Sequence, residues 1–153
     1  MNVNTRFNRR QFLQSTARTA SLVAVASATA PKVIAAESPG KRIGVGCIGL
    51  GGRGSDIISS AAPLPGVRVT AVCDVYTPHL QRGVERSQNP EVKTHVDYRE
   101  LLADPRVDAV IIATPDHWHC PMVLDAAKAR KDIDCEKRLS RNVEEAKRMR
   151  PAI

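Results

Sequence analysis

Glycine is concentrated in residues 42–56, RIGVGCIGLGGRGSD, where the pattern G-x-G-x-x-G occurs in two registers. The registers are Gly44, Gly46 and Gly49, and Gly49, Gly51 and Gly54. Such a pattern binds phosphate when a buried strand precedes it and a helix follows, because the free N–H groups of the helix N-terminus then face the anion. Only the second register satisfies this condition. It therefore predicts a site for the pyrophosphate of a dinucleotide.

The second register gives each glycine a task. Gly49 makes the tight turn, Gly51 lets the backbone approach the pyrophosphate, and Gly54 lets helix and strand pack closely. The arginine inside the loop points either to phosphate or to solvent. The candidate cofactor-binding residues of the loop are Gly49, Leu50, Gly51, Gly52, Arg53 and Gly54. The two unused glycines, Gly44 and Gly46, are interpreted as small residues where a helix crosses the first strand.

An acidic residue accompanies the glycines at the expected distance. Asp74 lies 20 residues after Gly54, at the end of the apolar run GVRVTAVCD. A carboxylate there accepts hydrogen bonds from the adenosine ribose and repels a 2′-phosphate. The pair of features predicts NAD as the cofactor in preference to NADP.

Apolar runs alternate with amphipathic segments along the chain. We expect strands over 42–49, 66–74, 92–96, 107–115 and 131–137, and helices over 55–62, 77–88, 97–104, 119–130 and 142–150. Asp97 and Glu100 have capping-box spacing at the start of one helix. This alternation predicts an α/β fold with a doubly wound parallel sheet, the Rossmann fold, whose ligands bind at the carboxyl ends of the strands.

Two further polar segments follow expected strands at that same edge. They are ATPDHWHCP, residues 113–121, and CEKRLS, residues 135–140. With the glycine loop and Asp74, they resemble the Gfo/Idh/MocA family of glucose–fructose oxidoreductases and inositol dehydrogenases. The match carries over Ala113, Thr114, Pro115, His119, Glu136 and Lys137, whereas Arg138 stands where the family has proline.

The resemblance implies a nicotinamide-dependent oxidoreductase acting on a sugar, cyclitol or other polyol. It implies that Thr114, Pro115 and His119 lie along the nicotinamide side of the cofactor, with Glu136 also in the cofactor site. It makes Lys137 the catalytic candidate, between nicotinamide and substrate. An ammonium group there can bind the reacting hydroxyl and stabilise negative charge as hydride leaves.

The cysteines and histidines raise the possibilities of disulfide bonds and of a zinc site. Cys47, Cys73, Cys120 and Cys135 form no C-x-x-C pair, and buried free thiols are the expected state, although the count also permits disulfides in an exported protein. His117, His119 and Cys120 have spacing that offers zinc three ligands. A closed zinc site needs four ligands, and no fourth is evident, so no metal is expected.

Residues 1–36 resemble a twin-arginine export signal. Arg9 and Arg10 stand two residues before a Phe-Leu pair, and a weakly apolar stretch follows that is too short to span a bilayer. The expected organisation is a signal peptide over residues 1–36 and a dinucleotide-binding domain over residues 37–153. The expected route is the twin-arginine translocation machinery, with a periplasmic destination; a disordered basic N-terminus is the alternative.

The charge of the chain does not indicate nucleic-acid binding. The net charge is +7, but five of the 23 basic residues and none of the 16 acidic residues lie in residues 1–36. The remainder carries about +2, and five aromatic side chains offer little to stack on bases. The expected partners are a dinucleotide and a small polyol or sugar, with no nucleic acid; oligomerisation is left open.

Departures from the family pattern gather after residue 129. Arg130 replaces a glycine, Asp134 puts a charge inside a strand, and Arg138 replaces proline. The sequence also stops inside the helix that leads to the family's second, α+β domain. Three interpretations remain open: a family oxidoreductase, whole or as a fragment; a fragment of a glycoside hydrolase that uses NAD transiently; and a non-catalytic remnant. We expect this chain alone to bind cofactor without turnover.

Overall fold

A computed structural model describes residues 42–153 of the chain. The expected export signal, residues 1–36, lies outside this part. The strands are β1 (Ile43–Ile48), β2 (Val67–Cys73), β3 (Lys93–His95), β4 (Ala109–Ile112) and β5 (Asp132–Cys135). The helices are α2 (Gly52–Ala61), α3 (Thr77–Ser87), α4 (Tyr98–Ala103), α5 (His119–Lys128) and α6 (Val143–Met149), with a 3-10 turn, η1 (Asp116–Trp118). Each expected strand and helix is present.

The five strands form one parallel sheet in the order β3-β2-β1-β4-β5. The strand order reverses between β1 and β4, so the carboxyl ends of these strands flank the crevice where Rossmann folds bind ligands. The predicted doubly wound α/β fold is confirmed. None of the helices in residues 42–153 is long and apolar enough to cross a membrane.

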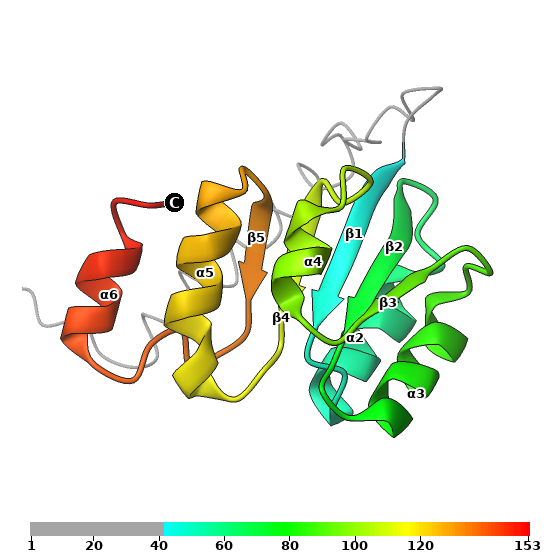
Figure 1. The fold of residues 1–153 in the computed structure, drawn as a ribbon, viewed down its shortest axis with the longest axis horizontal. Helices are drawn as coiled ribbons and strands as arrows, with labels where there is room; N and C mark the ends of the chain where they lie inside the picture. The colour runs from blue at the N-terminus through cyan, green and yellow to red at the C-terminus, as the bar shows by residue number, and fades with distance from the viewer. Residues whose placement is uncertain (1–41) are drawn as a thin grey trace, which may run out of the picture. The chain divides into compact units, whose positions relative to one another are not determined.

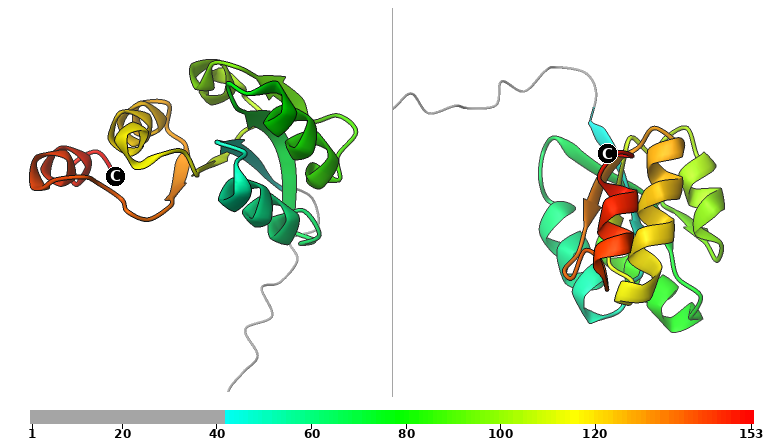
Figure 2. Two further views of the ribbon diagram at one scale, coloured as in Figure 1. Left: turned by 90° about the horizontal axis from the view of Figure 1, so that it is seen from below. Right: turned by 90° about the vertical axis from the view of Figure 1, so that its left-hand side faces the viewer.

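Helices cover both faces of the sheet (Figures 1 and 2). α4 and α5 pack on one face, and α2 and α3 pack on the other. The first core contains Leu101, Val107, Val110, Ile112, Val123 and Met149, and the second contains Val45, Cys47, Ile58, Val69, Val72 and Ile111. Burial on both faces explains why the central strands read as continuous apolar runs.

Two glycines of β1 lie where neighbouring segments pack closely against the strand. A Cβ on Gly46 would lie 2.7 Å from a methyl group of Leu101, and a Cβ on Gly44 would lie 1.9 Å from the carbonyl oxygen of Arg106. α4 therefore crosses β1 at Gly46, as the sequence predicts, while Gly44 makes room for the loop before β4.

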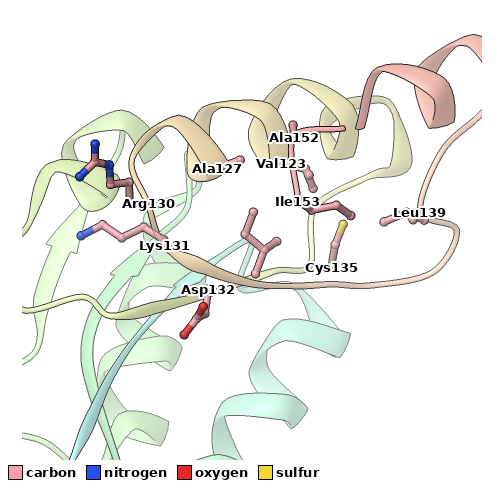
Figure 3. A pocket seen from close by; sticks show the side chains of 10 residues that line it. Val123, Ala127, Arg130, Lys131, Asp132, Cys135, Leu139, Ala152 and Ile153 are labelled. Carbon is pink, nitrogen blue, oxygen red and sulfur yellow. The ribbon is translucent and has the colours of Figure 1, made fainter. Parts of the chain in front are cut away.

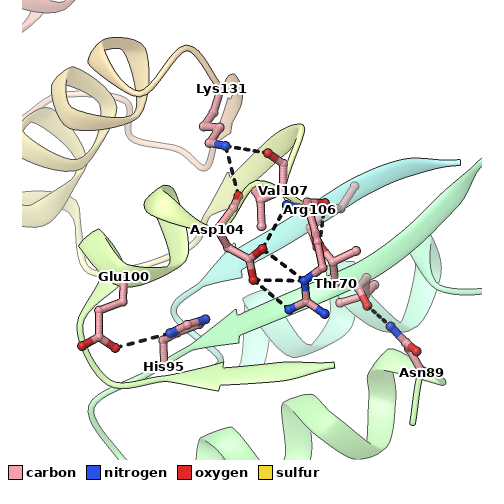
Figure 4. A network of polar contacts seen from close by, with 10 residues as sticks. Thr70, Asn89, His95, Glu100, Asp104, Arg106, Val107 and Lys131 are labelled. Carbon is pink, nitrogen blue, oxygen red and sulfur yellow. Dashed lines mark hydrogen bonds and ion pairs between the residues drawn. The ribbon is translucent and has the colours of Figure 1, made fainter. Parts of the chain in front are cut away.

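A polar network holds the loops that precede β4 and β5, at the amino ends of the strands (Figure 4). The Asp104 carboxylate accepts from Arg106 Nη2 at 2.7 Å and Nε at 3.1 Å. Lys131 Nζ donates to the carbonyl oxygens of Val107 at 2.7 Å and Asp104 at 3.2 Å. These contacts fix the sheet edge opposite the candidate site.

Three local features bear on the sequence-based expectations: the start of α2, the backbone conformation of Arg130 and the exposure of Asp134. α2 begins at Gly52, within the glycine loop, three residues before the expected start. Arg130 has φ +56°, the left-handed conformation that favours glycine after a helix, so its backbone keeps the geometry although the glycine is absent. Asp134 is exposed on β5, which explains how a charge fits within that strand.

The four cysteines are free, as expected. Burial is the main cause that raises the pKa of the Cys47 thiol to about 12, and burial likewise raises the pKa of Cys73 to about 12. Both therefore remain protonated at neutral pH and act as small apolar side chains.

Candidate cofactor-binding site

The glycine turn after β1 requires glycine at two positions. Gly49 has φ +88°, and a Cβ there would lie 2.8 Å from the backbone of Ala113. A Cβ on Gly54 would lie 1.9 Å from the carbonyl oxygen of Gly49. The turn and the first turn of α2 therefore pack against each other without side chains between them, as the second register predicts.

The N-terminus of α2 fits an anion. Gly51 is the N-cap, no side chain caps the helix, and its first turn holds no acidic residue. A Cβ on Gly52 would meet nothing within 4 Å, and one on Gly51 would meet only His79 at 3.9 Å. The backbone N–H groups and the positive end of the helix dipole are thus open to a pyrophosphate.

Asp74 is tied to the glycine turn. Its Oδ2 accepts a 2.7 Å hydrogen bond from the N–H of Leu50, and its Oδ1 accepts one of 2.9 Å from the N–H of Tyr76. The side chain is 10% exposed. A carboxylate offers about four lone-pair sites, so capacity remains for a ribose hydroxyl.

His79 is a member of this site that the sequence analysis did not single out. Its Nδ1 lies 3.1 Å from Oδ2 of Asp74, and its ring meets the Tyr76 ring edge-on, with centroids 4.9 Å apart. The available signal was its position five residues after Asp74, in the first turn of α3. The ring braces the carboxylate from the side of α3.

Several of the predicted residues line one cavity of about 830 Å³ at the carboxyl ends of the strands. Those residues are Gly49, Asp74, Thr114 and Pro115, joined by Ile48, Val75, Val96, Trp118 and Met122 among others. Val75 is 85% exposed and Trp118 is 44% exposed, so the rim presents apolar surface that a flat base or ring can cover. The charged residues Asp97, Arg99 and Glu100 also line the cavity, so its exposed surface is mixed apolar and polar.

Arg53 and Glu136 form an ion pair instead of standing free. Arg53 Nη2 and Nε each lie 2.6 Å from Oε1 of Glu136, joining the start of α2 to the loop after β5. The hydrogen bond from Arg53 is the main cause that lowers the pKa of Glu136. The sequence analysis left phosphate and solvent open as the surroundings of the Arg53 side chain. In the structure its partner is Glu136, which neither alternative included.

The loop after β5 places Lys137 at the same edge of the sheet. Lys137 is exposed, and no described residue pairs with its ammonium group; its backbone N–H donates to Glu136 Oε2 at 3.2 Å. Lys137 does not line the 830 Å³ cavity. The catalytic role of Lys137 stays a prediction, because it depends on what lies over this edge of the sheet.

His119 is buried beside the cavity wall, and its place along the cofactor stays a prediction. It is 1% exposed, and its Nε2 and Nδ1 lie 2.8 Å from the carbonyl oxygens of Thr114 and Arg138. Within residues 42–153, no group of three or more His, Cys, Asp and Glu side chains is arranged to hold a metal ion.

A second pocket, of about 450 Å³, lies between α5, β5 and the last residues of the chain (Figure 3). Its lining is mainly aliphatic, with Val123, Ile133, Leu139 and Ile153. It contains none of the predicted cofactor-binding residues, so the cavity beside Gly49 is the candidate dinucleotide site.

Comparison with known proteins agrees with this geometry. The family described as "Oxidoreductase family, NAD-binding Rossmann fold", Gfo/Idh/MocA, matches residues 43–152. The structure of myo-inositol dehydrogenase from Lactobacillus casei, in complex with NAD(H) and myo-inositol, is 32% identical with a TM-score of 0.68, covering 72% of this chain and 33% of that one.

Curated relatives point in a second direction. Glycosyl hydrolase family 109 protein 1 from Shewanella sp. (strain MR-4) and alpha-N-acetylgalactosaminidase from Shewanella oneidensis are each 38% identical over 160 residues, covering 90% of this chain. The chain spans about a third of the length of these relatives, 35% in both cases. Because the family match covers nearly all of residues 42–153, the chain belongs to the Gfo/Idh/MocA oxidoreductase family and carries its NAD-binding Rossmann domain.

Proposed function

We propose that this chain is the cofactor-binding part of an exported NAD-dependent oxidoreductase that acts on a sugar, cyclitol or other polyol. One observation carries the proposal: Asp74 is bonded to the glycine loop through Leu50 and lines the same cavity as Gly49 and Thr114. The ribose candidate is thus joined to the glycine loop, whose first glycine lines the same cavity while its other residues lie outside that lining.

The same carboxylate favours NAD over NADP. Asp74 is largely buried and accepts hydrogen bonds from the N–H groups of two backbone positions. A 2′-phosphate beside it would meet like charge in a partly desolvated place. Among residues 42–153, Arg53 is the basic side chain of the glycine loop, and it is paired with Glu136.

NAD, when bound, supplies a hydride acceptor. The chain's own residues bind and orient it: the α2 N-terminus holds the pyrophosphate, Asp74 the adenosine ribose, and Thr114 and Pro115 the wall towards the nicotinamide. Lys137 would donate a hydrogen bond to the substrate hydroxyl and stabilise the negative charge that develops there. These assignments rest on the family resemblance together with the shared sheet edge.

A glycoside hydrolase is the second candidate. The 38% identity to a Shewanella alpha-N-acetylgalactosaminidase, over 90% of this chain, favours it. In such an enzyme the cofactor is reduced and reoxidised within one cycle, so sugar is released without net formation of NADH. The cofactor site would be the same in both cases.

We further propose that the 153-residue chain binds cofactor without turnover. Residues 42–153 form the cofactor-binding layer, and Lys137 is exposed to solvent. Hydride transfer requires a substrate carbon held against the nicotinamide, and such positioning supplies several kcal/mol of the barrier. Water around Lys137 also weakens its electrostatic contribution.

Product analysis tests these alternatives. The chain is incubated with NAD⁺ and a panel of sugars and cyclitols, and separately with an aryl α-N-acetylgalactosaminide; NADH and released sugar are both measured. We expect neither product. Steady NADH formation would contradict the proposal of no turnover. If a product does form, NADH indicates an oxidoreductase, and released sugar without NADH indicates a hydrolase.

A further inference from the structure

We propose that His119 is a positioning residue that ties the loop after β4 to the loop after β5 and thereby sets the place of Lys137. The tie itself is a property of the described fold. Its consequence for the nicotinamide end of the cofactor rests on the proposed function.

The ring bridges two loops that are far apart in sequence. Nε2 lies 2.8 Å from the carbonyl oxygen of Thr114, five residues earlier, and Nδ1 lies 2.8 Å from that of Arg138, nineteen residues later. His119 opens α5 and is 1% exposed, so little water competes for either contact. A neutral imidazole carries one N–H and donates one hydrogen bond; in the Nδ1–H tautomer, on which the tie rests, the ring donates to the Arg138 carbonyl oxygen and Nε2 lies beside that of Thr114.

The two carbonyls belong to segments with distinct tasks. Thr114 lines the cavity beside Gly49, and the N–H of Ala113 extends the β4 ladder by donating to Ile48 at 2.8 Å. Arg138 directly follows Lys137. His119 follows the Thr114 segment directly, at the start of α5, so a hydrogen bond from its Nδ1 to the Arg138 carbonyl oxygen limits the separation between the cavity wall and the catalytic candidate.

Another contact joins the same loops, but it is exposed. Arg138 Nη2 lies 3.3 Å from Oδ2 of Asp116, with the two side chains 82% and 34% exposed. A surface ion pair of this kind is screened and contributes little. The buried imidazole is therefore the stronger connection. It contacts the backbone of Arg138, which stands where the family has a proline, whose ring would fix φ.

Direct binding of the cofactor by His119 fits the geometry less well. Both ring nitrogens face carbonyl oxygens, and the side chain is buried. A cofactor contact would require the ring to leave both partners. His117, two residues earlier, is exposed and stands in the same segment, so it provides a matched control.

Four variants of the full chain test the tie. His119→Asn keeps an amide nitrogen near the Nδ1 position, facing Arg138, whereas His119→Gln keeps one near the Nε2 position, facing Thr114. His119→Phe removes the N–H donor, and His117→Gln is the control. Hydrogen–deuterium exchange of residues 136–141 is measured without ligand, and the affinities for NAD⁺ and ADP-ribose are measured by calorimetry.

We expect His119→Phe and His119→Gln to speed exchange in residues 136–141 and to weaken NAD⁺ binding roughly tenfold, with ADP-ribose affinity held within about twofold. His119→Asn and His117→Gln should behave like the unsubstituted chain. If His119→Phe does not fold, the Asn and Gln variants still decide the question.

Three results would overturn the proposal: unchanged exchange in residues 136–141, equal loss of NAD⁺ and ADP-ribose affinity, or rescue by Gln but not by Asn. If the unsubstituted chain binds neither ligand, the proposed function fails. In that case, hydrogen–deuterium exchange in residues 136–141 alone supports or refutes the contact of His119 with the loop after β5.

Discussion

The backbone N–H of Leu50 donates a 2.7 Å hydrogen bond to Oδ2 of Asp74. The bond joins the glycine loop after β1 to the end of β2, across 24 residues. One carboxylate therefore shapes the glycine loop, and under the proposed function it also faces the adenosine ribose. Its charge and its role as an acceptor can be separated by substitution.

Asp74→Asn should separate them. The amide oxygen can still accept from Leu50, while the amide NH2 group replaces the oxygen that accepts from Tyr76, and the negative charge that opposes a 2′-phosphate is removed. We expect the ratio of NADP⁺ to NAD⁺ dissociation constants to fall roughly tenfold, with the free energy of unfolding lowered by about 1 kcal/mol through the lost Tyr76 hydrogen bond. Asp74→Ser should lower the same ratio of dissociation constants. It should also destabilise the chain, because the shorter serine side chain cannot reach the N–H of Leu50. An unchanged ratio in both variants would show that Asp74 does not face the ribose.

Glycine substitutions in the loop should differ sharply in their effect on stability. Gly54→Ala places a methyl group 1.9 Å from the Gly49 carbonyl oxygen, whereas Gly52→Ala meets nothing within 4 Å. We expect Gly54→Ala to lower the free energy of unfolding by about 2 kcal/mol or more, and Gly52→Ala to leave it unchanged or raised by up to ~1 kcal/mol. Urea unfolding without cofactor measures both; similar values would contradict the packing described.

Acid should weaken the fold through Asp104. Hydrogen bonds from the Arg106 side chain are the main cause that lowers the pKa of Asp104 from 3.8 to about 2. Because the folded-state pKa is depressed, the stabilisation is complete above about pH 5 and is lost as pH falls towards 2.

The Asp104 pair should contribute on the order of 1–2 kcal/mol, since Asp104 is buried but Arg106 is 39% exposed. Asp104→Asn should therefore flatten the fall in unfolding free energy between pH 6 and pH 3, measured by urea titration. Asp56→Asn removes a carboxylate that is 69% exposed and should leave the slope unchanged. Equal slopes for Asp104→Asn and the parent chain would refute the assignment.

Export should depend on the paired arginines. We expect the replacement of Arg9 and Arg10 by lysine to retain a reporter fused to residues 1–36 in the cytoplasm, because the pair is the feature read by the twin-arginine machinery. Fractionation of the reporter measures this. Undiminished export would show that this N-terminus uses another route.

The sequence predicts the elements of this fold well because its apolar runs are long and the turns between them are marked. The helix expected over 77–88 appears as α3, Thr77–Ser87, whereas the strand expected over 107–115 is shorter, Ala109–Ile112, because the residues on either side of it lie in turns and bends. The glycine register could also be chosen, because only one register stands between a strand and a helix.

Side-chain partners across the fold could not be predicted in the same way. Arg53 and Glu136 are 83 residues apart, and their pairing depends on the β5 loop returning to the start of α2. The burial of His119 likewise arises from the path of the backbone at Arg138. Neither contact leaves a periodic signal in the sequence.

Calorimetric titration of the full chain with NAD⁺ and NADP⁺, under matched salt and pH, tests the central claim most directly. The cavity formed by Gly49, Asp74 and Thr114 predicts saturable one-site binding of NAD⁺, at least about tenfold tighter than NADP⁺. Tighter binding of NADP⁺, or no saturable binding of either dinucleotide, would contradict the proposed role of this chain.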